Sequence, residues 1–294
     1  MKPAPFSYVR PATLDEALDV LGSDPHAKVL AGGQSLVPML SMRIASPTTL
    51  VDINGLAELA YVRTDEDGVR IGALARHVDV ETDVDAWRVQ PLLRHAMRLV
   101  AHPTIRNRGT TLGSVVHADA AAEMPAVAAL LDAAVTVAST RGRRTIEAAD
   151  LFVGPLECTV RPAELALELQ VPALRPGSGA AIDEVTRRHG DYALCGVAAV
   201  VSVGAAGAIE RVRASYLSVS PTPLVLDLSE AFVDGSASDA NVDAAAEIAT
   251  GAVDPETDIH GSADYRRHLA GVLTRRVVRA AHARATASDA QGAR

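Results

Sequence analysis

The chain has 294 residues, of which 48% are hydrophobic, and its formal net charge at pH 7 is −8. The length suffices for a substantial core and for more than one subdomain. The acidic balance argues against a general nucleic-acid binder, and no apolar run approaches the roughly 18 residues of a membrane span. The N-terminus lacks the apolar core of a signal peptide, so we expect a cytoplasmic protein. We expect it to bind neither a membrane nor nucleic acid.

Cysteine and histidine usage limits the metal chemistry of this chain. Cys158 and Cys195 are the only cysteines, too few for a disulfide framework. They are also too few for an iron–sulfur cluster held within the chain, which usually takes four thiolates. We interpret each as a buried free thiol. The nine histidines include no HExxH or similar spacing, so we predict no metal site.

The first 55 residues predict a small α/β unit with a parallel sheet, because strands and helices alternate along it. Thr13 and Glu16 have the spacing of a capping box, which begins a helix. The expected elements are a strand at 6–9, a helix from 14 to about 22, a strand at 29–31, a helix from 36 to about 42 and a strand at 49–53.

Between the second strand and the second helix lies what we call the first glycine segment, residues 32–35 (Gly-Gly-Gln-Ser). Gly32 and Gly33 let the backbone approach a ligand closely, and Ser35 is a candidate helix N-cap. A strand, a Gly-Gly turn and a helix start together can present free backbone N–H groups to an anion. An ordinary glycine turn is the alternative interpretation.

The middle of the chain contains what we call the second glycine segment, residues 109–114 (Gly-Thr-Thr-Leu-Gly-Ser), which we expect to be a loop. Before it, the pattern predicts a hairpin over 61–71 and a helix over 91–100; after it comes an apolar segment at 126–133. If both glycine segments hold one ligand, that ligand is long and anionic, and a dinucleotide fits. No Rossmann GxGxxG follows the first strand, so the site would be of another kind.

The second half predicts a separate sheet covered by helices. Alternating apolar residues predict a strand at 165–171. A linker over 172–179, strands at 182–187, 197–203 and 209–217 at meander spacing, and helices at about 242–250 and 263–285 follow. We interpret the arginines of the last helix as its solvated face; an interface with partner subunits is the alternative. These arginines are Arg266, Arg267, Arg275, Arg276 and Arg279.

Several longer motifs, in order along nearly the whole chain, resemble the FAD-binding medium subunits of the molybdenum hydroxylases, the xanthine dehydrogenase and carbon monoxide dehydrogenase flavoprotein family. These motifs lie at residues 31–36, 101–110, 117–119, 123–125, 187–193, 258–260 and 265–269. The resemblance implies an α+β fold. A PCMH-type FAD-binding domain (1–175) would comprise two α/β subdomains (about 1–55 and 56–175). A C-terminal domain of an antiparallel sheet plus helices (176–287) and a disordered tail (288–294) would follow.

The resemblance also implies which residues hold FAD. Backbone N–H groups of the first glycine segment would bind the pyrophosphate, and residues 111–114 would wrap its other side. Glu123 would bind the ribityl chain, and Asp191 and Tyr192 would lie near the isoalloxazine, where an aromatic ring can stack. The implied set is Ala31, Gly32, Gly33, Gln34, Ser35, Leu36, His102, Thr111, Leu112, Gly113, Ser114, Asp119, Glu123, Leu165, Asp191 and Tyr192.

By the same resemblance the chain is an electron-transfer subunit of an oxidoreductase. Electrons would pass from iron–sulfur clusters on a partner through FAD to an external acceptor. The implied partners are a molybdopterin-binding large subunit and a 2Fe–2S small subunit, in a heterotrimer or a dimer of heterotrimers. Because the flavin supplies the chemistry, we predict no catalytic side chain.

Three departures from the family pattern leave a second hypothesis open. Gly113 alone stands where the family pattern has a double glycine, so the chain is one residue short there, and Ala120 replaces a proline. Asp183 and Glu184 stand where many relatives have a lysine, which reverses the local charge beside an anionic cofactor. The alternative is a stand-alone homologue with a degenerate FAD loop, acting as a binding or scaffold protein or as a non-redox enzyme in the same cleft.

Overall fold

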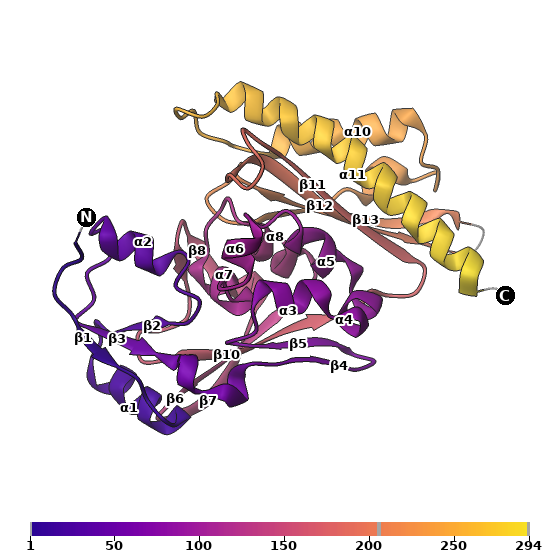
Figure 1. Ribbon diagram of the computed structural model, residues 1–294. Helices are drawn as coiled ribbons and strands as arrows, with labels where there is room; N and C mark the ends of the chain where they lie inside the picture. The colour runs from indigo at the N-terminus through magenta and orange to yellow at the C-terminus, as the bar shows by residue number, and fades with distance from the viewer. Residues whose placement is uncertain (1, 205–206, 293–294) are drawn as a thin grey trace.

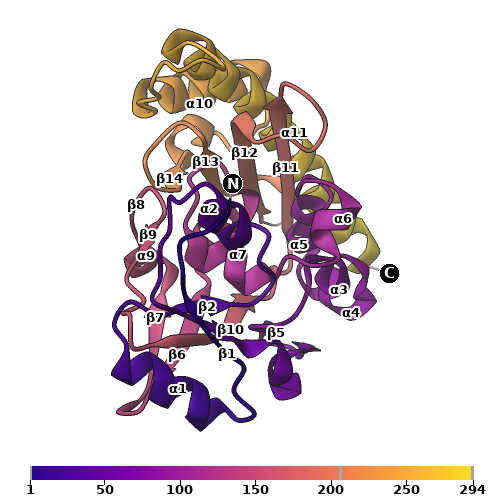
Figure 2. The same ribbon diagram turned by 60° about the vertical axis from the view of Figure 1, so that its left-hand side comes forward.

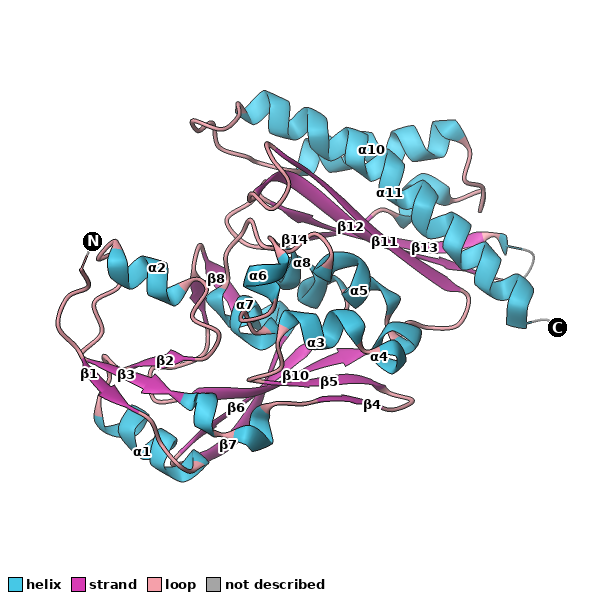
Figure 3. Cartoon of the chain, in the orientation of Figure 1, coloured by secondary structure: helices cyan, strands magenta, loops and turns pink. Residues whose placement is uncertain are grey.

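A computed structural model describes residues 2–204 and 207–292. A five-stranded antiparallel sheet, a layer of helices, a four-stranded antiparallel sheet and two long helices follow one another as layers (Figures 1 and 3). A three-stranded parallel unit with helix α1 lies beside the five-stranded sheet, at the end of the molecule opposite helix α10 (Figure 2). This mixed architecture confirms the predicted α+β fold. Among the described residues, no helix combines the length and hydropathy needed to cross a bilayer.

The N-terminal unit is the predicted parallel sheet, in the order β1-β3-β2. The Thr13 hydroxyl accepts from the Glu16 amide, while the Glu16 carboxylate accepts from the Ala12 amide at 2.7 Å, so the capping box closes one residue earlier than expected. Ser35 makes no cap hydrogen bond, so that prediction was wrong. The elements are β1 (Ser7–Val9), α1 (Leu14–Ser23), β2 (Lys28–Leu30), α2 (Leu36–Ser41), β3 (Thr49–Asp52) and the 3₁₀ turns at Ile53–Gly55 and Ala57–Leu59.

The five-stranded sheet has the order β4-β5-β10-β6-β7, so that strand β10 returns from later in the chain to its centre. The predicted hairpin is confirmed as β4 and β5. The strands are β4 (Val62–Thr64), β5 (Gly68–Gly72), β6 (Ala134–Ser139), β7 (Gly142–Glu147) and β10 (Leu165–Pro172), and the hairpin β8 (Phe152–Gly154) and β9 (Glu157–Cys158) stands apart. The helices are α3 (His77–Thr82), α4 (Val84–Val89), α5 (Pro91–Met97), α6 (Pro103–Arg106), α7 (Thr111–His117), α8 (Glu123–Leu130) and α9 (Ala148–Leu151).

The C-terminal sheet is an antiparallel meander in the order β11-β12-β13-β14. Strand β14 was not predicted, because two prolines at 221 and 223 precede it and suggest irregular chain. Helix α11 continues to Gly292, so the tail predicted from 288 was wrong as far as 292, and 293–294 lie outside the described residues. The elements are β11 (Ser178–Thr186), β12 (Ala193–Val203), β13 (Ile209–Leu217), β14 (Leu224–Asp227), a 3₁₀ turn (Ser229–Phe232), α10 (Asp239–Ala252) and α11 (Ala263–Gly292).

Strand β12 joins the two halves of the molecule because both of its faces are buried. Val197, Ala199 and Val201 pack into the core beneath α10 and α11, whereas Ala198 packs into the core of the first half. Helices α5 and α8 contact this inner face of the sheet. A strand with two buried faces needs an uninterrupted apolar run, which is what 193–201 provides. The C-terminal sheet is therefore fixed on the helices of the first half.

Arg266 corrects the prediction that the arginines of α11 form one solvated face. Its side chain is only 8% exposed and donates to the Leu194 carbonyl (2.8 Å) and to the Asp258 carboxylate (2.7 Å). The other four make ion pairs at the surface, such as Arg267 with Asp264. Arg266 thus connects the start of α11 to the start of β12.

We expect Arg266→Met to lower the free energy of unfolding by about 2 kcal/mol, because it leaves a buried carbonyl and a charged carboxylate without their donor. The matched change Arg267→Met should stay within about 0.5 kcal/mol, since its pair with Asp264 is exposed. Urea unfolding of both variants measures the difference. Equal losses would contradict the role assigned to Arg266.

Candidate functional site

A cavity of about 650 Å³ lies between the N-terminal parallel unit and helix α7. Its volume is within the range of about 300–1,000 Å³ typical of small-molecule sites. Four stretches far apart in sequence supply most of its wall: residues 31–36, 109–114, 156–166 and 190–192. The cavity is therefore assembled from both halves of the chain.

The two glycine segments touch each other at one edge of this cavity. A Cβ atom on Gly32 would lie 2.5 Å from the Arg108 carbonyl oxygen and 2.8 Å from the Gly109 Cα. No side chain larger than hydrogen fits between two backbones at that separation. Glycine at position 32 is thus required by a backbone-to-backbone contact.

Arg76 and Asn54 hold the same two segments together with side-chain hydrogen bonds. The Arg76 guanidinium donates to the Arg108 carbonyl (2.6 Å) and to the Asn54 side-chain oxygen (2.7 Å). The Asn54 amide in turn donates to the Ala31 carbonyl (2.9 Å), directly before the first glycine segment. The planar guanidinium is suited to such a fixed two-pronged contact. The spacing of the two segments is therefore set by a chain of three hydrogen bonds.

The second glycine segment is not the loop that the sequence predicted, because helix α7 begins within it at Thr111. Helices α2 and α7 both start at the cavity, and neither Ser35 nor Thr110 makes a cap hydrogen bond. The first N–H groups of a helix have no partner inside the helix, so an anion in the cavity can accept them. Leu112 is 1% exposed, so most of its side chain lies in the core and leaves the backbone of α7 presented to the cavity.

His77 is a residue of this site that sequence reasoning missed. It is buried at the cavity wall, its amide donates to the Gly109 carbonyl at 3.0 Å, and its Nδ1 lies 3.3 Å from the Thr111 hydroxyl. Burial, helped by the Arg106 charge, lowers the pKa of His77 to about 4, so the ring is neutral at pH 7. Nothing in its local sequence signals this, since strand order brings it to the second glycine segment from over thirty residues away.

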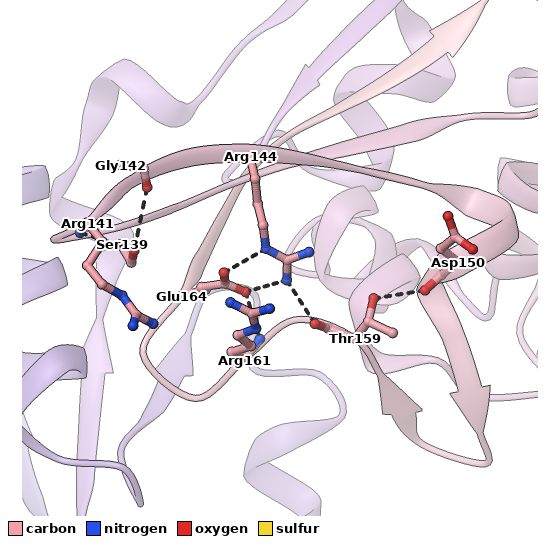
Figure 4. Close-up of polar contacts among 8 residues, drawn as sticks. All are labelled: Ser139, Arg141, Gly142, Arg144, Asp150, Thr159, Arg161 and Glu164. Atoms are coloured by element: carbon pink, nitrogen blue, oxygen red, sulfur yellow. Dashed lines mark hydrogen bonds and ion pairs between the residues drawn. The ribbon is translucent and has the colours of Figure 1, made fainter.

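A partly buried ion pair, between Arg144 and Glu164, holds residues of a further wall of the cavity (Figure 4). The Arg144 guanidinium donates twice to the Glu164 carboxylate, at 2.7 and 2.8 Å, and once to the Thr159 carbonyl at 3.0 Å. Glu164 also accepts from the Arg161 amide at 2.9 Å. These bonds fix residues 159–164, of which Arg161 and Glu164 line the cavity. The hydrogen bonds from Arg144 hold the pKa of Glu164 below its usual value.

A further part of the cavity wall is acidic. Glu123, the first residue of α8, lines the cavity with Asp119 and Tyr192. Burial raises the pKa of Glu123 to about 7, and Asp119 adds to the shift. Partial desolvation of its hydroxyl, with the charges of Asp119 and Glu123, raises the pKa of Tyr192. The charge of Asp119 therefore acts on the ionisation of both Glu123 and Tyr192.

The cavity brings together all but two of the residues that the resemblance implied. Those that line it are Ala31, Gly32, Gly33, Gln34, Ser35, Leu36, Leu112, Gly113, Ser114, Asp119, Glu123, Leu165, Asp191 and Tyr192. Thr111 is fully buried behind the wall, against His77. His102 is outside the lining; its ring packs edge-on to that of His189, with centroids 5.6 Å apart. Lining residues that the sequence did not single out for this site include Lys28 and Pro162.

Neither cysteine forms a disulfide. Cys195 is buried as predicted, but Cys158 is only partly buried and lines the cavity, donating to the Val116 carbonyl at 3.2 Å. Burial raises the pKa of the Cys158 thiol, which keeps it protonated. Within the described part of the chain, no group of three His, Cys, Asp or Glu side chains could hold a metal ion.

Two family models match this chain. Residues 4–174 match the FAD binding domain in molybdopterin dehydrogenase, and residues 180–281 match the CO dehydrogenase flavoprotein C-terminal domain. Two uncapped helix starts and two touching glycine segments fit the diphosphate of FAD, because they offer backbone donors without bulk. The observed cavity is thus compatible with the cofactor of the matching model.

Curated relatives and solved structures agree with these matches. The 6-hydroxypseudooxynicotine dehydrogenase complex subunit alpha of Paenarthrobacter nicotinovorans is 42% identical, over 95% of this chain and 95% of that protein. The carbon monoxide dehydrogenase of Hydrogenophaga pseudoflava includes a chain with a TM-score of 0.92 and 35% identity, covering 97% of this chain and 99% of that one. A chain of quinoline 2-oxidoreductase from Pseudomonas putida 86 has a TM-score of 0.90 at 35% identity, covering 98% and 100%.

We expect Gly32→Ala to weaken FAD binding at least tenfold, or about 1.4 kcal/mol, because the new methyl group pushes the two glycine segments apart. Isothermal titration of FAD into the FAD-free chain measures the change. Gly251→Ala is the matched control, since a Cβ atom there meets nothing within 4 Å, and it should bind FAD like the parent. Unchanged affinity in Gly32→Ala would contradict the backbone contact.

Arg76→Met should weaken FAD binding by about tenfold while the chain stays folded. Methionine preserves most of the volume but removes both hydrogen bonds that hold the glycine segments, and a factor of ten corresponds to about 1.4 kcal/mol. Arg88→Met, which removes only an exposed pair with Asp85, is the control. If both variants bind FAD equally well, Arg76 does not set the spacing of the site.

Proposed function

The chain belongs to the FAD-binding medium subunits of the molybdenum-containing hydroxylases and dehydrogenases, and we propose that it carries electrons from a partner's iron–sulfur cluster through FAD to an external acceptor. One observation supports this proposal above the others. Both glycine segments and the 190–192 stretch line one cavity, in a chain that has only two cysteines and so cannot hold a cluster itself. In this proposal the iron–sulfur clusters are therefore on a partner subunit and FAD is on this chain.

In this proposal the two glycine segments bind the diphosphate through the backbone N–H groups at the starts of α2 and α7. Arg76, Asn54 and His77 hold those backbones in place without touching the cofactor. At the acidic part of the wall, Glu123 accepts hydrogen bonds from the ribityl hydroxyls, since a carboxyl oxygen is the natural acceptor for an alcohol. The wall held by Arg144 and Glu164 closes the remaining side, with Leu165 beside it.

Asp191 and Tyr192 would flank the isoalloxazine. Tyr192 is 68% exposed at the edge of the cavity, where a large aromatic ring gains little unless something packs on it. A planar flavin is a suitable partner, because offset stacking of two rings is favourable. Tyr192 would thus cover one face of the ring system and limit its contact with water.

When bound, FAD would supply the redox chemistry, because it can accept electrons one at a time and release them in pairs. The residues of this chain bind it, orient it and exclude water from it. The implied partners are a molybdopterin-binding large subunit and a 2Fe–2S small subunit, where substrate oxidation and the first electron transfers would occur. Several relatives are named as subunits or chains of multi-subunit dehydrogenases, which supports this assembly.

The test is to purify the affinity-tagged full-length chain from its native cells and to measure flavin, molybdenum and iron in one gel-filtration peak. We expect one FAD per chain, together with molybdenum and about two irons per 2Fe–2S cluster. Rapid reduction of the bound flavin on adding an oxidisable substrate of the complex would follow. A peak that contains flavin but neither metal would contradict the electron-transfer role and favour the stand-alone alternative. A peak without flavin would contradict both FAD roles.

We expect Tyr192→Ala to expose the flavin and so to raise its fluorescence and its accessibility to iodide quenching several-fold. Tyr192→Phe should behave like the parent, because stacking needs the ring and not the hydroxyl. Steady-state fluorescence of the FAD-loaded chain measures both. Equal fluorescence in the Ala and Phe variants would contradict the stacking role.

A further inference from the structure

The loop between strands β11 and β12, residues 187–192, belongs to the second half of the chain and reaches the cavity described above. Its last three residues, 190–192, line that cavity, whereas its first three are exposed. Inside the loop, the Asp191 amide donates to the Arg188 carbonyl at 3.1 Å, which closes a single turn. One turn does not decide where a loop lies on the protein, so its position depends on what the loop touches.

His102, in the first half of the chain, lies directly against this 187–192 loop. A Cβ atom on Gly190 would lie 2.5 Å from His102 Cε1 and 2.6 Å from its Nε2, so the imidazole fills the space of that side chain. The same ring packs edge-on against the His189 ring, with centroids 5.6 Å apart. Gly190 also has a φ of +83°, which favours glycine. The His102 ring therefore contacts the two loop residues that come directly before Asp191 and Tyr192.

The backbone that presents His102 is itself held in an uncommon conformation. Ala101 has a φ of +42°, in the left-handed region that residues other than glycine seldom adopt. The Arg106 guanidinium donates to the carbonyls of residues 100 and 101, at 3.0 and 3.3 Å. It also pairs with Glu81 at 2.8 Å, and both side chains are largely buried. Strain of this kind persists where the surrounding structure enforces it, and it concentrates at functional sites.

The short helix α6 connects the contact at His102 to the second glycine segment. His102 is the residue before α6, and the Ile105 carbonyl within α6 accepts from the Gly109 amide at 2.7 Å. Gly109 takes part in the close contact with the first glycine segment. The motif at 101–110 thus meets the first glycine segment at one end and the 187–192 loop at the other.

We propose that His102 is a positioning residue of the FAD site, whose ring supports the 187–192 loop and so sets where Asp191 and Tyr192 lie beside the flavin. This inference rests on the proposed function, because the loop affects FAD only if FAD occupies the cavity. His102 is outside the cavity lining, so its effect on the cofactor passes through the loop. Without the ring, Gly190 has open space on that side, and its backbone freedom lets the loop move away from the cavity.

Trypsin cleavage of the FAD-free, full-length chain tests this support without the cofactor. Arg187 and Arg188 are exposed in the loop, and a protease cuts a segment faster when it opens more often. His102→Ala should raise the rate of cleavage after these two arginines roughly threefold or more, measured by mass spectrometry of the fragments. His102→Phe keeps a ring against Gly190 and should stay close to the parent. His268→Ala, which removes an exposed histidine of α11, should do the same.

A double-variant cycle in the FAD-loaded chain tests whether His102 acts through the loop. His102→Ala should raise flavin fluorescence and iodide quenching, in the same direction as Tyr192→Ala. Adding His102→Ala to Tyr192→Ala should then change little, because the aromatic ring that the loop positions is already gone. Effects of the two changes that multiply would overturn the positioning role, since His102 would then reach the flavin by another route.

The two readouts separate failure of this inference from failure of the proposed function. Equal cleavage of the parent and His102→Ala would overturn the support of the loop, and unchanged fluorescence would overturn its effect on the flavin. Either result leaves the proposed function standing if the parent binds FAD. A parent that binds no FAD would refute the proposed function, and the cofactor role of His102 with it, whereas the cleavage rates would still decide whether the ring holds the loop.

Discussion

The close approach of two backbones, at Gly32 and at Arg108–Gly109, is the constraint on which the site depends. This contact joins the N-terminal parallel α/β unit to the helix layer. The hydrogen bonds of Asn54 and Arg76 hold the two backbones at a fixed distance from each other. Because the starts of α2 and α7 follow directly from these two segments, the directions of their free N–H groups are fixed by the same contact. The anion site that we propose is a consequence of this geometry rather than of any charged side chain.

The site also requires that the C-terminal sheet stays packed on the helices of the first half. Strand β12 is buried on both faces, so the free energy of docking comes from apolar burial on α5 and α8. The Ser218 amide adds a bond to the Ala120 carbonyl at 2.8 Å, which ties the end of β13 to the turn before α8. As a result, residues 190–192, which precede β12, reach the cavity from the far half of the chain. The matching relatives contain both halves, which agrees with a site that neither half completes alone.

Sequence reasoning recovered the elements that have strong local signals. The capping box at Thr13, the hairpin around 65–68 and the apolar strand at 197–203 each report a short-range preference, and each was found. What it missed depends on distant partners: Arg76 and Asn54 look like ordinary surface polar residues until β5 and β3 bring them together. His77 and Glu164 acquire their roles in the same way. Strand β14 was hidden by its flanking prolines, and the start of α7 by glycine and threonines that usually favour loops.

Glu164 and Glu184 show how one residue type produces opposite charge behaviour in one molecule. Glu164 accepts two hydrogen bonds from Arg144 and one from the Arg161 amide, and the bonds from Arg144 hold its pKa below the ordinary value. Glu184 has a buried oxygen without any donor, and burial raises its pKa to about 8. Glu164 therefore keeps a constant charge through the physiological range, whereas the charge of Glu184 changes within it. Asp183 and Glu184, which depart from the family pattern, are not among the residues that line the cavity, so the backbone donors of the two glycine segments do not depend on them.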